Sequence, residues 1–309
     1  MLTVTMIGTA ATMPLPERAT ACAAMAYRGR WLLFDCGEGT QIAARRANVS
    51  LMKVDAVCLT HYHGDHIFGL PGLLQTLGTM DRKEPLTIIG PEGLQAAMAP
   101  ILALAGDELP YGVRLMTLPP EGLALNRLHK SWTAQARLTA FPTQHRVISQ
   151  GYAVTLARSG KFQAEKALAL GVPQSQWRQL QLGESVTVEG RIILPQDVVG
   201  APRRGLKAVY SGDTMPCPAL AEAATDADLL ICEATYPSQD YADKAAQFGH
   251  STYADAGALA REAGARRLWL THYSAIISDP EVHLPQAQAE YPDARCGYDG
   301  MTETLRFSP

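Results

Sequence analysis

Short apolar segments that end abruptly in polar residues recur along this chain of 309 residues. They lie at residues 2–10, 31–40, 54–66, 86–93, 137–145, 206–214, 228–235 and 266–274. Several of them are apolar without interruption, which favours strands buried on both faces over strands with one exposed face. A chain with such strands needs covering layers on both sides of its sheets.

Helical patterns lie between some of these segments, at residues 67–80, 93–105 and 251–265. The last pattern has a Ser/Thr start, an alanine-rich interior and a glycine near its end. The alternation predicts an α/β fold in which helices cover central sheets. The tetrapeptide LTHY also occurs twice, at 59–62 and 270–273, each time closing an apolar segment. This repeat fits a fold whose two halves present strand ends to one shared site.

The segment HYHGDH at residues 61–66 holds three of the eight histidines of the chain. His61 and His63 are two residues apart, so an extended backbone places both on one side, and Gly64 allows a turn before the next two polar residues. The two imidazoles can hold one metal ion, while Asp65 and His66 are available to a neighbouring ion. Imidazole and carboxylate ligands without a thiolate favour zinc or manganese-like ions.

Three further candidate ligands follow other apolar segments: His145, Asp213 and His272. A carboxylate has two oxygens to share, so Asp213 suits a bridging position. Two ions ~3.5 to 4 Å apart can activate a water and offset the charge on the group that is attacked. The seven residues together predict a two-metal hydrolytic site, whereas His129 and His283 have no such setting and are expected to be ordinary surface residues.

The remaining composition excludes several classes of protein. Six cysteines are scattered without a CxxC pair, and Cys36, Cys58 and Cys232 lie in or beside apolar segments, so we expect reduced, buried thiols. No apolar run approaches the ~18 residues of a membrane span, and the N-terminus lacks the pattern of a signal peptide, which favours a cytoplasmic protein. A net charge of -3 gives no overall basic field, so nucleic-acid binding would need a local patch.

The pattern HxHxDH followed by distant His, Asp and His resembles the signature of the metallo-β-lactamase fold, and the chain is similar to its ribonuclease Z branch over nearly its whole length. The resemblance rests on GTAATMP, FDCGEGTQ, THYHGDHIFGLPGLL, SGDT, CEAT, GHST and LTHYS. It implies one domain over residues 1–309, a four-layer αβ/βα sandwich with an inserted arm at about 158–190. It further implies two zinc ions, a homodimer and endonucleolytic removal of the 3′ trailer of precursor tRNA.

The resemblance also assigns roles to individual residues. The first zinc would be held by His61, His63 and His145, the second by Asp65, His66 and His272, with Asp213 bridging. Asp65 would also act as general base, His250 of GHST would steady the phosphate and assist the leaving oxygen, and Glu233 of CEAT would orient His250. A carboxylate partner keeps a histidine protonated, as this role requires. Alternatively, His250 is the residue before a helix capped by Ser251, and Glu233 is a plain strand-end acid.

The arm corresponds in position to the one with which ribonuclease Z grips tRNA. Its candidate phosphate contacts are Arg158, Lys161, Lys166 and Arg178. Three glutamates reduce the net positive charge of this patch: Glu165, Glu184 and Glu189. A solvated charged surface is therefore the alternative interpretation.

Several positions depart from the ribonuclease Z pattern, and they concern the substrate more than the metal ions. No glycine follows Pro173, and Ala19 stands after Arg18 in place of Asn. Cys232 replaces the first residue of the usual HEAT motif, and residues 275–277 read Ala-Ile-Ile in place of Ser-Arg-Tyr. Isoleucine cannot replace the bidentate phosphate clamp of an arginine.

These departures leave two alternatives beside a tRNA-processing enzyme. The first is a two-metal hydrolase of a small phosphodiester or an aryl sulfate ester. The second is a non-catalytic RNA-binding or scaffold protein that keeps the fold, which is disfavoured because none of the seven candidate ligands is missing.

Overall fold

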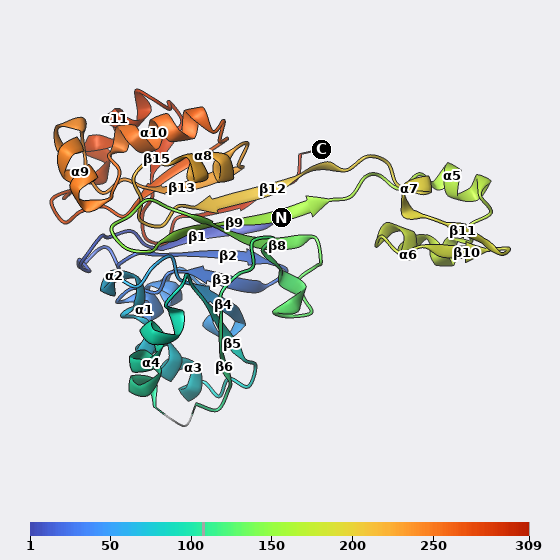
Figure 1. Ribbon diagram of the computed structural model, residues 1–309, viewed down its shortest axis with the longest axis horizontal. Coiled ribbons are helices and arrows are strands. Elements are labelled where there is room, and N and C mark those ends of the chain that lie inside the picture. Colours follow the sequence, from blue (N-terminus) through green and yellow to red (C-terminus); the bar gives the residue numbers. More distant parts are fainter. Residues whose placement is uncertain (107–108, 309) are drawn as a thin grey trace. The chain divides into compact units, whose positions relative to one another are not determined.

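The chain forms two compact units in the computed structural model, which describes residues 1–106 and 109–308 (Figure 1). The larger unit comprises Met1–Thr155 and Lys207–Arg306. The smaller unit comprises Leu156–Leu206 together with Phe307 and Ser308. All seven candidate metal ligands belong to the larger unit.

Two seven-stranded sheets make up the centre of the larger unit, in the orders β16-β1-β2-β3-β4-β5-β6 and β15-β14-β13-β12-β9-β8-β7. The strands of the first sheet are β1 (Leu2–Gly8), β2 (Cys22–Tyr27), β3 (Arg30–Phe34), β4 (Val54–Cys58), β5 (Leu86–Ile89), β6 (Val113–Met116) and β16 (Thr302–Leu305). Those of the second are β7 (Leu123–Ala124), β8 (Ala136–Pro142), β9 (Gln150–Arg158), β12 (Arg203–Tyr210), β13 (Leu229–Glu233), β14 (Leu268–Thr271) and β15 (Ala294–Cys296). Strands β3 to β6 are parallel, as are β12 to β15, so in each set the carboxyl ends meet at one edge.

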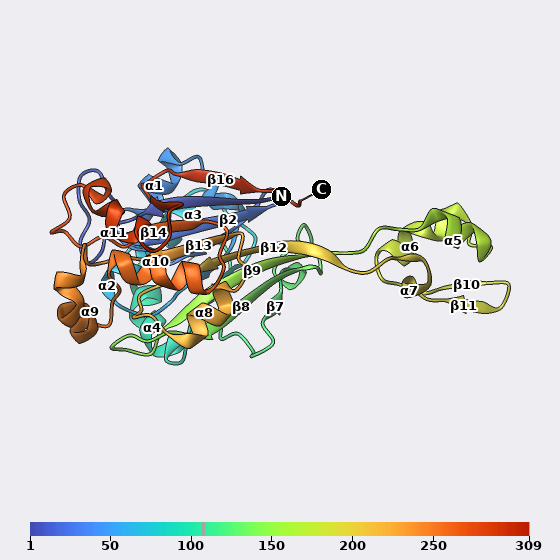
Figure 2. The ribbon, with the colours of Figure 1, turned by 90° about the horizontal axis from the view of Figure 1, so that it is seen from above.

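Helices cover the outer face of each sheet in this unit (Figures 1 and 2). They are α1 (Thr40–Arg46), α2 (Gly64–Ile67), α3 (Leu70–Thr79), α4 (Leu94–Ala105), α8 (Pro218–Ala224), α9 (Ala242–Phe248), α10 (Tyr253–Glu262) and α11 (Leu284–Gln288). Buried side chains of α3 and α4 share one apolar cluster with β4 and β5, and those of α8 and α10 share another with β13 and β14. Within the described residues, no helix has the length and apolar character needed to cross a bilayer.

The inner faces of the two sheets pack against each other. The ring of Phe34 on β3 lies 5.6 Å from that of Tyr152 on β9 and 5.8 Å from that of Tyr210 on β12, measured between centroids. The order helix, sheet, sheet, helix confirms the predicted four-layer sandwich. It also buries β4, β5, β13 and β14 completely, in agreement with their mostly apolar sequences.

Each of the eight apolar segments contains a strand, and the three helical patterns contain α3, α4 and α10. The predicted cap of α10 is wrong by one residue. Thr252 is the N-cap and accepts a hydrogen bond from the Asp255 backbone N–H at 3.2 Å, whereas the Ser251 hydroxyl donates to the Thr214 carbonyl at 2.7 Å. The six cysteines are free, and all except Cys217 are buried, as expected.

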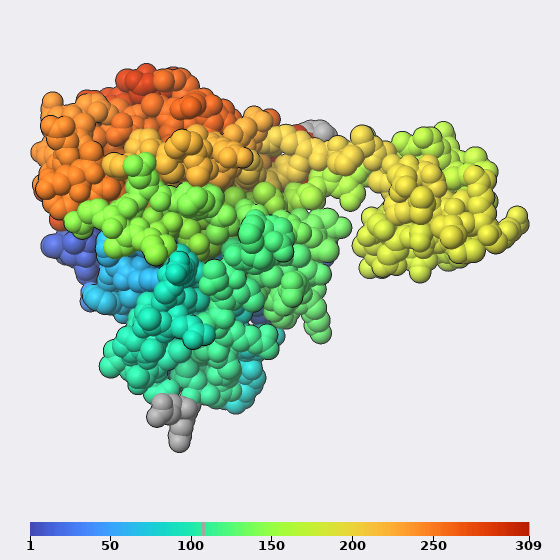
Figure 3. Space-filling model, in the orientation of Figure 1, coloured from blue at the N-terminus to red at the C-terminus, as the bar shows by residue number. Residues whose placement is uncertain are grey.

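The smaller unit has an apolar core of its own. It contains α5 (Ala164–Ala169), α6 (Trp177–Gln181), α7 (Pro195–Val198) and a hairpin of β10 (Val186–Val188) and β11 (Arg191–Ile193). Ala167, Leu180 and Ile193 are among its buried residues, and the rings of Phe162 and Trp177 pack at 5.2 Å. Its atoms form the yellow-green body in Figure 3.

Candidate metal centre

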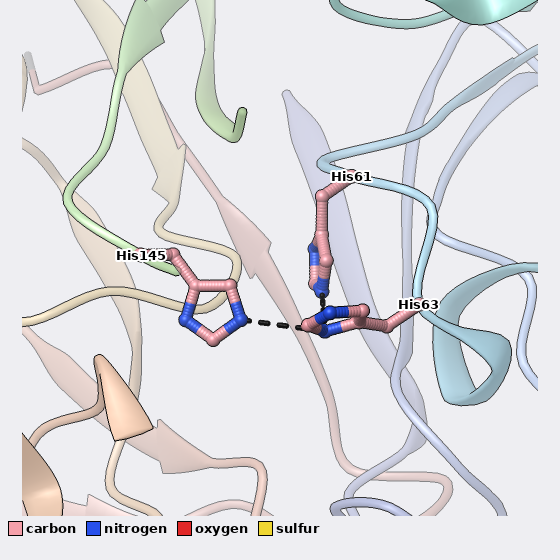
Figure 4. A group of neighbouring side chains, drawn as sticks. All are labelled: His61, His63 and His145. Carbon is pink, nitrogen blue, oxygen red and sulfur yellow. Dashed lines mark hydrogen bonds between the residues drawn. The ribbon is translucent and has the colours of Figure 1, made fainter. Parts of the chain in front are cut away.

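Three histidines converge where β4 and β8 end (Figure 4). Nε2 of His61 lies 3.0 Å from Nδ1 of His63, and Nε2 of His145 lies 3.3 Å from the same atom. Burial lowers the pKa of each of these three imidazoles, which favours the neutral form. A neutral imidazole offers a lone pair, so this set can bind a metal ion.

A second set lies beside the first and comes from α2 and the end of β14. Oδ2 of Asp65 is 3.6 Å from Nε2 of His66 and 3.4 Å from Nε2 of His272. Asp213 lies between the two sets, with Oδ2 at 3.7 Å from His61 Nε2 and 3.3 Å from His66 Nε2, and Oδ1 at 3.2 Å from His272 Nε2. The structure thus brings all seven predicted residues together around one point.

Several candidate ligand atoms at this point are buried and lack a hydrogen-bond partner within the described part of the chain. They are Nε2 of His66, Nε2 of His272 and Oδ1 of Asp213. A buried polar group left unpaired costs ~1–3 kcal/mol, so three that face one another call for a shared partner. Imidazole nitrogens and carboxylate oxygens are suitable ligands for a divalent metal ion, and the residues therefore fit one.

Polar neighbours hold most of these rings by Nδ1, so that Nε2 faces the centre. The Nδ1 pairs are His61 with Thr60 Oγ1 at 3.0 Å, His66 with Asp35 Oδ2 at 2.8 Å, His145 with the Gly249 carbonyl at 2.7 Å and His272 with Thr235 Oγ1 at 2.9 Å. His63 differs, because its Nδ1 faces the other two histidines. Such outer partners fix ring orientation and raise the basicity of a ligand.

Two of these supporting residues, Asp35 and Thr235, were not singled out from the sequence. Asp35 is fully buried and also accepts hydrogen bonds from the Thr60 backbone N–H at 2.8 Å and the Tyr210 hydroxyl at 3.1 Å. The sequence signal that could have identified Asp35 is the same as for the candidate ligands, because Asp35 directly follows the apolar strand β3 within FDCGEGTQ. Thr235 ends CEAT after β13 in the same way.

His250 and Glu233 form a hydrogen-bonded pair beside the candidate metal ligands. His250 Nδ1 lies 2.8 Å from Glu233 Oε1, and the buried carboxylate also accepts from the Thr214 backbone N–H at 2.8 Å. Burial alone would lower the pKa of His250, but the charge and hydrogen bond of Glu233 outweigh it and raise that pKa to about 9. His250 is therefore cationic at neutral pH. Its Nδ1 is 4.0 Å from Asp213 Oδ2, too far for a hydrogen bond.

A cavity of about 400 Å³ lies over this centre, and His63, Asp65, Asp213, His250 and His272 line it together with Phe68 and Arg146. His129 and His283 lie elsewhere. His129 Nε2 contacts Glu84 Oε1 at 3.4 Å, and the His283 ring packs 6.2 Å from that of Tyr253.

Comparisons with known proteins agree with this fold. Residues 15–111 match the metallo-beta-lactamase superfamily, and residues 147–273 match a beta-lactamase superfamily domain. The chain is 39% identical to the ribonuclease Z of Lachnospira eligens, with 99% of each chain covered, and 40% identical to that of Methanosarcina mazei, with 90% of each covered.

Among solved structures, the short form of human tRNase Z matches with a TM-score of 0.69 at 26% identity, covering 99% of this chain and 100% of that one. The protein YhfI of Bacillus subtilis has the same fold, with a TM-score of 0.68 at 21% identity, and 98% of each chain is covered. The chain belongs to the ribonuclease Z family of metal-dependent hydrolases with the metallo-β-lactamase fold.

Proposed function

We propose that this protein is an endoribonuclease that removes the 3′ trailer of precursor tRNA at a two-metal centre. The observation that carries the proposal is the convergence of seven metal-ligand candidates with the His250–Glu233 pair on one cavity. Relatives that match nearly the whole chain at 39% identity are ribonuclease Z proteins, which favours an RNA substrate over a small ester.

Each proposed ligand set consists of side chains that lie close to one another. One zinc ion would be held by His61, His63 and His145, the other by Asp65, His66 and His272, and Asp213 would serve both. Manganese or another divalent ion is the alternative occupant, because the ligand set contains no thiolate. When bound, the pair of ions supplies an activated water and neutralises charge on the phosphate.

The chain's own residues complete the reaction. Asp65 orients the attacking water and accepts its proton, and the Thr12 backbone N–H fixes this carboxylate by donating to Oδ2 at 2.7 Å. His250, cationic because of Glu233, stabilises the phosphate and donates a proton to the leaving 3′ oxygen of the tRNA. Glu233 stays charged and holds the ring in place through Nδ1.

Two further features belong to this proposal. The smaller unit is the arm that contacts tRNA, with Lys161, Lys166 and Arg178 exposed to solvent. Arg158 is instead engaged locally, because its guanidinium stacks on Phe307 at 5.2 Å and donates to the Ser308 carbonyl. The protein forms a homodimer, which sedimentation velocity would test.

The deciding experiment is cleavage of a 3′-extended precursor tRNA by purified, zinc-loaded protein. A chelated sample and an aryl phosphodiester are run alongside. We expect metal-dependent cuts directly after the discriminator nucleotide. Turnover of the small ester alone would assign the second candidate function, and a protein that takes up no metal would be a non-catalytic binder.

A further inference from the structure

One arginine lines the cavity over the candidate metal centre without an ion-pair or hydrogen-bond partner for its guanidinium in the described part of the chain. Arg146 directly follows the candidate ligand His145, and it is the only lysine or arginine among the described residues that line this cavity. Its side chain is exposed, and no ion pair or hydrogen bond of its guanidinium is found in the described part of the chain. Other arginines of the larger unit are engaged, such as Arg30 with Asp55 and Arg82 with the Val54 carbonyl.

The fold nevertheless fixes the position of Arg146. Its guanidinium lies over the ring of Phe248, the last residue of α9, at 5.0 Å from the centroid. The loop that carries it is closed at its base, where the Thr143 backbone N–H donates to the Ser149 carbonyl at 3.2 Å and their hydroxyls lie 2.7 Å apart. An arginine that stacks on a ring but has no ion-pair partner can bind an anion.

Gly249 allows this loop to lie against the end of α9. Its φ is +73°, a region that favours glycine, and a Cβ at this position would lie only 3.1 Å from the Arg146 backbone nitrogen and 3.0 Å from His145 Nδ1. The absent side chain therefore lets the Gly249 carbonyl orient His145 while the next residue of the loop, Arg146, is held against Phe248.

The chemistry of the cavity indicates what Arg146 would bind. A guanidinium presents a planar fork of donors that matches a phosphate, and it stays charged at all relevant pH values. The scissile phosphate already faces His250 and the proposed ions, whereas an RNA strand also brings a phosphate on each side of the one that is cut. The segment Ala275-Ile276-Ile277 offers no cation for these, because it contains no basic residue.

We propose that Arg146 binds the RNA backbone phosphate next to the scissile phosphate and thereby positions the strand over the metal centre. This inference rests on the proposed function. Arg146 is a positioning residue, so its loss weakens RNA binding. Since one charged phosphate contact disappears, binding also becomes less dependent on salt.

The test measures the dissociation constant and kcat/KM for a 3′-extended precursor RNA with Arg146→Ala, Arg146→Lys and the wild type. Arg114→Ala is the matched control, because Arg114 is an exposed arginine on the edge strand β6. We expect Arg146→Ala to raise the dissociation constant roughly 10- to 100-fold and to reduce the slope of log K against log salt by about 0.7. Arg146→Lys should keep the slope and lose part of the affinity, and Arg114→Ala should match the wild type.

The decisive comparison uses RNAs in which a neutral methylphosphonate replaces the phosphate on the 5′ or the 3′ side of the scissile one. One of these two RNAs should bind the wild type as weakly as the natural RNA binds Arg146→Ala. The same modified RNA should bind Arg146→Ala as tightly as the natural RNA does. The inference would be overturned if Arg146→Ala lost the same affinity, relative to the wild type, for the natural RNA and for both modified RNAs. It would also be overturned if Arg146→Ala bound with an unchanged dependence on salt.

Zinc content and thermal unfolding of each variant show whether a loss of binding reflects damage to the fold or to the metal centre. Arg146→Lys keeps the inference testable if the alanine variant is unstable. A wild-type protein that neither binds nor cleaves the natural RNA would overturn the proposed function and this inference together. A wild type that cleaves it while Arg146→Ala is indistinguishable would overturn this inference alone.

Discussion

Replacing Asp35 by Asn should weaken metal binding without removing a proposed ligand. Oδ2 of Asp35 pairs with His66 Nδ1 at 2.8 Å, and Oδ1 accepts from the Thr60 backbone N–H at 2.8 Å. An asparagine has one oxygen, so its NH₂ group must face one of these two donors. The substitution keeps the shape of the side chain and removes both a charge and an acceptor at a fully buried position.

The expected size follows from these contacts. Loss of an outer carboxylate that orients a ligating histidine typically lowers metal affinity ~10- to 100-fold, which is ~1.4–2.7 kcal/mol. The loss of affinity should concern the ion of the proposed set Asp65, His66 and His272, because Asp35 contacts His66. Lost hydrogen bonds to a charged group should also lower the free energy of unfolding of the metal-free protein by ~1.5–3 kcal/mol. Competition with a chromophoric chelator measures the first quantity, and denaturation in the presence of EDTA measures the second.

Asp55→Asn is the matched control for this variant. Asp55 is a buried carboxylate on β4, the strand that leads to His61, and it pairs with Arg30 and accepts from Trp132 Nε1 at 2.7 Å. Its replacement should destabilise the fold and leave zinc affinity as in the wild type. Asp35 would have no specific role in metal binding if Asp35→Asn bound both ions with wild-type affinity, or if Asp55→Asn lost as much affinity.

Three further predictions concern the proposed catalytic residues. Asp65→Ala should abolish hydrolysis of every substrate, because it removes a proposed ligand and the proposed general base together. Unchanged turnover would contradict the proposed metal site. His250→Ala should lower turnover by ~10² to 10⁴-fold with metal content intact, and loss of metal in elemental analysis would instead make His250 a ligand. Glu233→Gln removes the charge that raises the pKa of His250, so burial should lower that pKa. Because the protonated form is the active one, the basic limb of the pH–rate profile should move to lower pH than in the wild type, and a limb that does not move would contradict the role of Glu233.

The strands and the convergence of the candidate ligands were predictable because their signals are local. An uninterrupted apolar segment indicates a buried strand, and polar residues at its carboxyl end stand where strand ends meet. The order of the strands was not predictable, since it depends on contacts between distant parts of the chain. The pairing of Leu2 on β1 with Leu305 on β16 is one example, because nothing near either residue specifies the other.

The supporting residues were less predictable for a related reason. A strand-end aspartate such as Asp35 has many structural uses, and only the folded chain shows that its partner is His66. The cap of α10 illustrates the same limit. Ser251 and Thr252 both suit an N-cap, and the choice is decided by the hydrogen bond that Ser251 makes to Thr214 in a different segment.

Three non-glycine residues with positive φ lie around one of the two proposed ligand sets. Thr12, Asp35 and His272 all have positive φ, at 65°, 61° and 61°, and for the β-branched Thr12 this is a true outlier. Thr12 donates its backbone N–H to Asp65, Asp35 holds His66, and His272 is itself a proposed ligand. Conformations of this kind cost ~1–3 kcal/mol each and persist only where the surroundings hold them. The set of Asp65, His66 and His272 therefore depends on support from several distant segments, and its ion should be the first to be lost when that support is weakened.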